Sequence, residues 1–148
     1  MRKVFIVSTM LCAVMAMTAC KNTTHQPVAD TTVVTADTAE HVNGGMMTSV
    51  DAEKFSEIIK MEDILLVDVR TPDEYAEGHI EGAVNIDVKA DDFAERTKDI
   101  TGNVAVYCRG GKRSRTAGSK LIVQGCLVYN LDGGIKEWME KGFPVVTQ

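Results

Sequence analysis

The sequence lacks several features that mark common classes of protein. Its 16 lysines and arginines are outnumbered by 21 aspartates and glutamates, which gives a formal net charge of -5. Such a chain repels phosphate backbones, so nucleic acid is not an expected partner. Only Cys108 and Cys126 follow residue 20, too few for a disulfide scaffold. After the N-terminal region no apolar run reaches about 18 residues, so no later membrane-spanning helix is expected.

The first 20 residues have the composition of a targeting segment. A positively charged start, Met1 to Lys3, precedes the apolar residues 4–17, and the segment ends in Ala19 and Cys20. The apolar part is too short for a spanning helix and is typical of a secretory signal peptide. The ending resembles a bacterial lipobox, in which Cys20 is lipidated and becomes the new N-terminus. We therefore expect a signal peptide over residues 1–19 and a protein lipid-anchored to a membrane of the bacterial cell envelope; the alternative is a soluble secreted protein cut near Ala19.

Residues 20–46 are predicted to form a flexible tether behind the lipidated cysteine. This segment is rich in threonine and aspartate and has no Phe, Trp or Tyr, so it cannot bury enough surface to offset its ordering entropy. His25 and His41 lie in it, and we expect them to be solvated rather than to bind metal. The predicted organisation is thus a signal peptide, a tether and one folded domain over residues 47–148.

The remainder of the chain alternates apolar runs with helical patterns. Strands separated by helices predict an α/β fold, in which a parallel sheet is covered by helices on both faces. In such a sheet, ligands bind beyond the carboxyl ends of the strands. The predicted strands are 64–69, 83–86, 104–107 and 127–130, and the predicted helices are 49–59, 71–77, 91–98, 114–124 and 135–141.

A glycine-rich, basic loop follows the predicted strand 104–107. A strand, a tight loop and a helix in this order direct backbone N–H groups and a helix N-terminus at the loop's first side chain, the Cys108 sulfur. The backbone N–H groups, the helix N-terminus and the loop cations all favour the thiolate over the thiol. We therefore expect the pKa of Cys108 to lie below its ordinary ~8.5. An inert core cysteine beside a solvated turn is the alternative. The loop consists of Cys108, Arg109, Gly110, Gly111, Lys112, Arg113 and Ser114.

Five segments of the chain carry motifs, namely Leu65–Arg70, Glu74–Tyr75, Gly78–Asn85, Cys108–Ser114, and Leu131–Gly134 with Trp138. Together these motifs resemble a single rhodanese domain. They occur in the family's order over roughly residues 48–146. The resemblance implies an α/β domain that transfers sulfur and requires no metal and no organic cofactor. It also implies a small sulfur-containing anion as donor, a thiol or cyanide as acceptor, and a monomeric protein.

The resemblance assigns a covalent role to Cys108. Its sulfur would attack the outer sulfur of a thiosulfate-type donor, release sulfite, and hold the transferred sulfur as a persulfide. The backbone N–H groups of residues 109–113 would bind the persulfide anion, and the two loop glycines would permit the necessary curvature. The three loop cations would hold the donor and the leaving sulfite, and the Ser114 hydroxyl would also reach the anion.

Other polar residues of the motifs are expected to support the fold. Asp68 ends a predicted buried strand, and we expect Arg70 to form an ion pair with Glu74. His79 could act as a base, but its Gly-His-Ile setting favours a structural turn. Ser114 is expected to act as the N-cap of the helix that follows the loop.

Cys126 precedes a predicted strand and is expected to be a small buried hydrophobic residue. The alternative is a resolving thiol that forms a disulfide with Cys108.

Two other functions remain open at this stage. One is a non-enzymatic persulfide carrier or sensing module, which an intact Cys108 does not separate from an enzyme. The other is a cysteine-dependent phosphatase or arsenate reductase. Relatives of that kind place an arginine six positions after the nucleophile, but here that position is Ser114 and Arg113 comes at five. The shorter loop favours sulfur over the larger phosphate or arsenate group.

Overall fold

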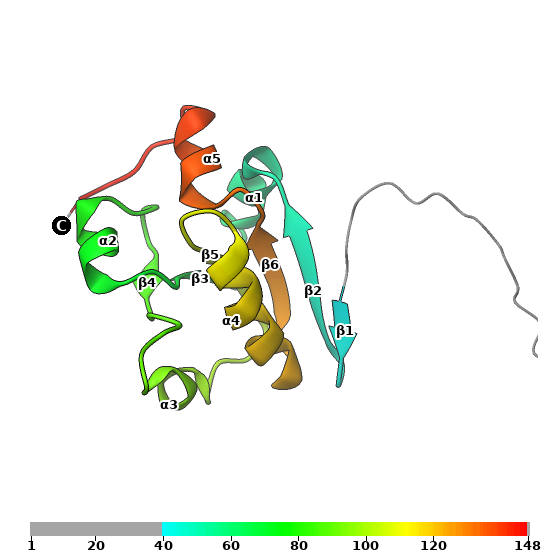
Figure 1. Ribbon diagram of the computed structural model, residues 1–148. Helices are drawn as coiled ribbons and strands as arrows, with labels where there is room; N and C mark the ends of the chain where they lie inside the picture. Colours follow the sequence, from blue (N-terminus) through cyan, green and yellow to red (C-terminus); the bar gives the residue numbers. More distant parts are fainter. Residues whose placement is uncertain (1–39, 148) are drawn as a thin grey trace, which may run out of the picture. The chain divides into compact units, whose positions relative to one another are not determined.

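The computed structural model describes residues 40–147 (Figure 1). The predicted signal peptide, Cys20, His25 and most of the predicted tether lie outside these residues. Within them, no helix has the length and apolar character needed to cross a membrane. In chain order the elements are β1 (Glu40–Val42), β2 (Gly45–Val50), α1 (Ala52–Ile58), β3 (Ile64–Asp68), α2 (Pro72–Glu77), β4 (Val84–Asn85), α3 (Phe93–Thr97), β5 (Asn103–Tyr107), α4 (Lys112–Val123), β6 (Leu127–Leu131) and α5 (Gly134–Glu140).

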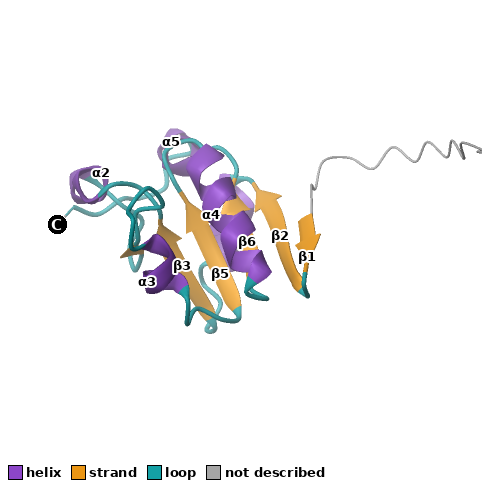
Figure 2. Ribbon diagram, turned by 60° about the horizontal axis from the view of Figure 1, so that its bottom comes forward, coloured by secondary structure: helices purple, strands orange, loops and turns teal. Residues whose placement is uncertain are grey.

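The described strands form one sheet in the order β1-β2-β6-β5-β3-β4 (Figure 2). The strands from β2 to β4 in this order pair in parallel, and β1 pairs antiparallel with β2. The predicted parallel sheet is thus confirmed. The strand β5, which leads to Cys108, lies between β3 and β6 and has a neighbour on each side.

Helices cover both faces of the sheet, as predicted. Side chains of α3 and α4 pack in one core cluster, and side chains of α1 and α5 pack in a second. The alternation of β5 separates the two clusters. Val104 and Val106 face α4, whereas Ala105 and Tyr107 face α1 and α5. Cys108 follows the same alternation as Val104 and Val106 and packs in the cluster that contains α4.

The parallel arrangement brings three segments to one edge of the sheet. Asp68 is the last residue of β3, and Cys108 and Asp132 directly follow β5 and β6. Because β5 pairs with both other strands, all three ends lie side by side. This edge is where ligands bind in open parallel sheets.

The fold begins earlier than the predicted tether allows. Residues 40–42 form β1 and residues 45–50 form β2, where a tether was expected up to residue 46. The strand β2 pairs along its length with β6 and buries Met47 at 1% exposure. Gly45 lies against the Ile122 backbone, so close that a Cβ would not fit. The absence of aromatic residues made this strand hard to recognise, since the one fully buried hydrophobic side chain within Gly45–Val50 is that of Met47.

The helix boundaries confirm some predicted caps and correct others. Thr71 and Glu74 form a reciprocal capping box at the start of α2, and Gly78 ends that helix. The cap of α1 is Asp51. The helix α4 begins at Lys112, and its N-cap is Gly111 at φ 81° rather than Ser114. The left-handed glycine lets the chain turn into the helix earlier than the serine pattern indicates.

Candidate functional site

The cysteine loop, residues 108–114, begins directly after β5 and ends in the first turn of α4. Its first side chain, Cys108, is 1% exposed. The Ser114 hydroxyl oxygen lies 3.5 Å from the Cys108 sulfur and 2.9 Å from the Gly111 carbonyl oxygen, so its single proton can be donated to either. The backbone N–H groups of Gly110, Arg113 and Ser114 also donate to the sulfur. Of the N–H groups expected to converge here, those of residues 109–113, the groups of Gly110 and Arg113 donate to the sulfur, and Ser114 adds one from outside that range.

Two opposing effects set the ionisation of Cys108. Burial raises the pKa of its thiol, because a buried thiolate loses hydration. The Ser114 hydroxyl and the three backbone N–H groups lower the pKa, because they bind the anion. The hydrogen bonds prevail, and the pKa of Cys108 is lowered from its ordinary value. A sulfur that is buried and still ionisable is a nucleophile with little competing hydration.

The first turn of α5 holds the cysteine loop in this orientation. The Ile135 N–H donates to the Cys108 carbonyl at 2.8 Å, and the Lys136 N–H donates to the Arg109 carbonyl at 3.2 Å. In a trans peptide unit the C=O and N–H groups point in opposite directions. The Arg109 carbonyl and the Gly110 N–H belong to one such unit. Binding the carbonyl to α5 therefore directs the N–H toward the sulfur.

Close backbone contacts explain Gly134, which follows β6, and Gly111 in the cysteine loop. Gly134 has φ 65°, and a Cβ there would lie 2.5 Å from the Cys108 carbonyl oxygen and from the Gly110 nitrogen. On the other side of this contact, a Cβ on Gly111 would lie 1.8 Å from the Asp132 carbonyl oxygen. The loop and the β6–α5 turn thus pack backbone to backbone, which only glycine permits at these positions.

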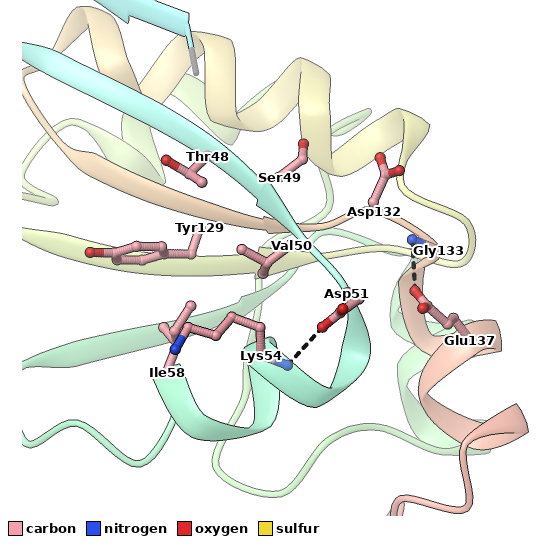
Figure 3. A pocket seen from close by; sticks show the side chains of 10 residues that line it. All are labelled: Thr48, Ser49, Val50, Asp51, Lys54, Ile58, Tyr129, Asp132, Gly133 and Glu137. Carbon is pink, nitrogen blue, oxygen red and sulfur yellow. Dashed lines mark hydrogen bonds between the residues drawn. The ribbon is translucent and has the colours of Figure 1, made fainter. Parts of the chain in front are cut away.

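A cavity of about 770 Å³ lies beside the same β6–α5 turn, between β2, α1 and α5 (Figure 3). Its polar side chains have local partners. The Glu137 carboxylate accepts the Gly133 N–H at 3.2 Å, and Asp51 accepts the Lys54 N–H at 2.8 Å. Asp132 forms an ion pair with Arg115. None of the ten lining residues is a cysteine. The connection between this cavity and the cysteine loop is Glu137, which stabilises the turn that holds the loop.

The loop cation Arg113, which was expected to hold the donor, is bound to a carboxylate of α2. Its guanidinium forms two hydrogen bonds with the Glu74 carboxylate, at 2.6 and 2.7 Å. Arg113 lowers the pKa of Glu74 from 4.5 to about 2, with a further contribution from Thr71. The expected ion pair between Arg70 and Glu74 is accordingly wrong. Glu74 bridges α2 to the cysteine loop, and the charge of Arg113 is neutralised.

Arg70 instead forms a buried ion pair with Asp68. The Arg70 side chain donates to both carboxylate oxygens of Asp68 and to the Gly78 carbonyl, at distances from 2.6 to 3.0 Å. The guanidinium carbon also lies 5.8 Å from the Tyr107 ring centre. Burial and the neighbouring Asp68 raise the pKa of Tyr107. This network joins β3, β5 and the end of α2, in keeping with the structural support expected of Asp68 and Arg70.

Two cations of the loop remain available to a ligand. Arg109 and Lys112 are exposed, and neither forms an ion pair within residues 40–147. Sequence reasoning missed a third cation beside them, Lys136, whose backbone is bonded to Arg109. Its only signal in the sequence is its place two residues after the Gly133-Gly134 pair.

His79 has the structural environment that was expected. Its ring stacks on Tyr75 with 3.7 Å between ring centres, and Nδ1 lies 3.0 Å from the Tyr75 carbonyl oxygen. Its backbone forms two hydrogen bonds with Val146 at 2.8 Å. His79 therefore fastens the C-terminal segment to the end of α2.

Cys126 lies at the opposite end of the sheet from Cys108. It precedes Leu127, which pairs with Asn103 at the start of β5, whereas Cys108 follows the end of that strand. The five residue-to-residue steps from Asn103 to Cys108 span about 16 Å at roughly 3.3 Å per step. A disulfide requires Cα atoms within about 7 Å. Cys126 is buried, burial raises its pKa, and its thiol donates to the Ile100 carbonyl. The expectation of a buried small residue is confirmed.

Within the described part of the chain, no group of three histidine, cysteine or carboxylate side chains is placed to hold a metal ion.

Replacing Ser114 with alanine tests the hydrogen bonds to the sulfur. We expect Ser114→Ala to raise the pKa of Cys108, because one donor to the thiolate is lost while burial is unchanged. The rate of Cys108 alkylation by iodoacetamide, followed against pH by site-resolved mass spectrometry, measures this pKa. Ser56→Ala, a change on exposed α1, is the control and should leave the profile unchanged. Identical profiles for Ser114→Ala and the wild type would contradict the assignment.

Acidification tests the bridge between Glu74 and Arg113. The folded-state pKa of Glu74 lies below its unfolded value, so its contribution to stability is present above about pH 4.5 and is lost as pH falls toward 2. Because solvent screens this partly exposed pair, we expect Glu74→Gln to lower the free energy of unfolding by about 1 kcal/mol near neutral pH. The difference should shrink through the acidic window. Urea unfolding at several pH values measures it, with Glu57→Gln as the control; a constant difference would count against the bridge.

Comparison with known proteins agrees with this geometry. The Rhodanese-like domain family matches residues 51–141. A sulfurtransferase of Allochromatium vinosum is 40% identical over 106 residues, which cover 69% of this chain and 97% of that protein. The thiosulfate sulfurtransferase GlpE of Pseudomonas entomophila is 36% identical over 81 residues, covering 54% and 74%. A solved rhodanese-related protein of Thermoplasma volcanium is 34% identical, with a TM-score of 0.59 over 68% of this chain and 98% of that chain. A domain match of this extent, on a fold and a cysteine loop of this form, shows that the chain belongs to the rhodanese family.

Proposed function

We propose that this protein is a sulfurtransferase that moves a sulfane sulfur from thiosulfate or a similar donor to a thiol or cyanide through a persulfide on Cys108. The observation that carries the proposal is the environment of the Cys108 sulfur. The thiol is buried, yet its pKa is lowered by the Ser114 hydroxyl and three backbone N–H groups. Relatives named sulfurtransferase support the same reaction class.

In the first half-reaction the Cys108 thiolate attacks the outer sulfur of thiosulfate. A bond forms between Sγ and that sulfur, the sulfur–sulfur bond of thiosulfate breaks, and sulfite leaves with the bonding electrons. The N–H groups that bind the thiolate face the sulfur already, so they stabilise the persulfide anion without reorganisation. Arg109 and Lys112 supply the exposed positive charge that attracts the dianionic donor, since Arg113 is neutralised by Glu74.

In the second half-reaction a thiolate or cyanide attacks the outer sulfur of the persulfide. A bond forms between the acceptor and that sulfur, and the bond to Sγ breaks. The Cys108 thiolate is a good leaving group because the same hydrogen bonds that lower its pKa stabilise it. The proton balance closes when the acceptor enters as an anion and the Cys108 thiolate is regenerated.

The loop geometry argues against phosphatase or arsenate chemistry. The sixth position after Cys108 is occupied by Ser114, whose hydroxyl lies against the Gly111 carbonyl and the sulfur. Arg113, at the fifth position, is hydrogen-bonded to the Glu74 carboxylate. Neither residue offers the free guanidinium that a bound phosphate requires.

We also propose that the protein is anchored to a membrane of the bacterial cell envelope through a lipid on Cys20, with the domain acting at that surface. The support is the sequence alone: a charged start, an apolar segment and a cysteine at the predicted cleavage site.

Intact mass after thiosulfate treatment tests the chemistry. The wild type should gain one sulfur atom per chain, and the gain should disappear on addition of cyanide with thiocyanate released. Cys108→Ser should gain nothing, whereas Cys126→Ser, the control for a second buried thiol, should gain one atom like the wild type. A gain that persists in Cys108→Ser would contradict the proposal. Stoichiometric gain without release to any acceptor would assign a persulfide carrier instead.

Membrane fractionation tests the anchor. The full chain, expressed in a bacterium, should sediment with membranes and be released by detergent. Cys20→Ala should be found in the soluble fraction, because the lipid that holds the chain is absent. Retention of Cys20→Ala in the membrane fraction would contradict the lipid anchor.

A further inference from the structure

A groove of about 290 Å³ borders the cysteine loop, and no single family motif forms it. Arg109 of the loop lines it, together with side chains of α2 and α5. Lys136 and Met139 are the α5 residues that extend furthest into solvent there, and Met139 is 51% exposed. The Lys136 N–H bond to the Arg109 carbonyl fixes this part of α5 relative to the loop.

The charges that line the groove do not cancel. Arg70 is bound to Asp68, and Glu74 is bound to Arg113, so neither contributes a free charge. Three charged side chains remain, namely Arg109, Lys136 and Glu77. Lys136 lies 3.6 Å from Glu140, but both side chains are more than 60% exposed, and such pairs are weak. The groove therefore has a net positive charge beside an apolar Met139.

We propose that this groove is the acceptor subsite and that it selects a small thiol bearing a carboxylate, with Lys136 and Arg109 as the specificity-determining cations. The inference rests on the proposed function. Once the persulfide has formed, its outer sulfur occupies the mouth of the amide ring. The body of an incoming acceptor must then lie beside the loop, and the groove is adjacent to it. Met139 would contact the methylene groups between the thiol and the carboxylate.

The transfer balances without a further reactant. The acceptor thiolate forms a bond to the outer sulfur of the persulfide, the bond from that sulfur to Cys108 Sγ breaks, and the electron pair remains on the Cys108 thiolate. The acceptor leaves as a persulfide that carries the same carboxylate. Lys136 and Arg109 take no part in the bond changes and act by holding the carboxylate.

A charge series of three thiols tests the subsite. The protein is first loaded with thiosulfate and freed of donor, so that only the second half-reaction is measured. The loaded protein is then mixed with 3-mercaptopropionate, 2-mercaptoethanol or cysteamine, which are anionic, neutral and cationic. The loss of one sulfur atom is followed by mass spectrometry, and rates are expressed per thiolate. We expect the anionic thiol to react fastest and the cationic thiol slowest.

Substitution of Lys136 should reduce this preference. In Lys136→Gln we expect the ratio of anionic to cationic rates to fall about threefold to fivefold, and further in Lys136→Glu. High salt should reduce the ratio in the wild type, because it screens exposed charges. Lys141→Gln is the matched control, since it removes a lysine from the other end of the same helix, where Lys141 pairs with Glu53. Its ratio should equal that of the wild type.

The outcomes separate this inference from the proposed function. A protein that gains no sulfur from thiosulfate overturns the proposed function and the subsite with it. A protein that loads normally but transfers to all three thiols equally overturns the subsite alone. The same holds if Lys136→Gln loads normally and keeps the wild-type ratio, or if cysteamine is the fastest acceptor.

Discussion

The convergence of backbone N–H groups on one buried sulfur is the interaction on which the rest of the site depends. Burial alone would raise the pKa of Cys108 and make it an inert core residue. The Ser114 hydroxyl and the amides of Gly110, Arg113 and Ser114 together reverse that effect, and the amides do so with dipoles that are part of the main chain. Such donors need no side-chain reorganisation when charge moves from the thiolate to a persulfide and back.

The surrounding fold keeps those N–H groups in place from two sides. The helix α5 binds the carbonyls of Cys108 and Arg109, which orients the peptide units of the loop, and Glu137 stabilises the turn before that helix. On the other side Glu74 holds Arg113, the residue that contributes one of the amides. The ion pair therefore positions the loop rather than offering charge to a substrate. Charge for the substrate comes from the exposed cations Arg109 and Lys112, and from Lys136 in the proposed subsite.

Features of the site that are local in the sequence could be predicted, and features that depend on long-range packing could not. The strand leading to Cys108, its glycine-rich loop and the capped start of α2 were predictable because neighbouring residues determine them. The Glu74–Arg113 pair joins residues 39 positions apart, whereas the sequence favoured Arg70, a near neighbour in the chain, as the partner of Glu74. Lys136 reaches the loop only because β6 lies next to β5. The strand β2 was not predicted, because pairing with β6 stabilises it rather than its own composition.

Specific loop amides bind the Cys108 thiolate, and a pH titration of amide nitrogen and proton chemical shifts tests this interaction most directly. The amides of Gly110, Arg113 and Ser114 should shift together, with one midpoint that lies below the ordinary thiol pKa and equals the midpoint of thiolate absorbance. In Cys108→Ser these shifts should be absent. If the three amides show no titration at that midpoint, or titrate equally in Cys108→Ser, the sulfur is not held as described.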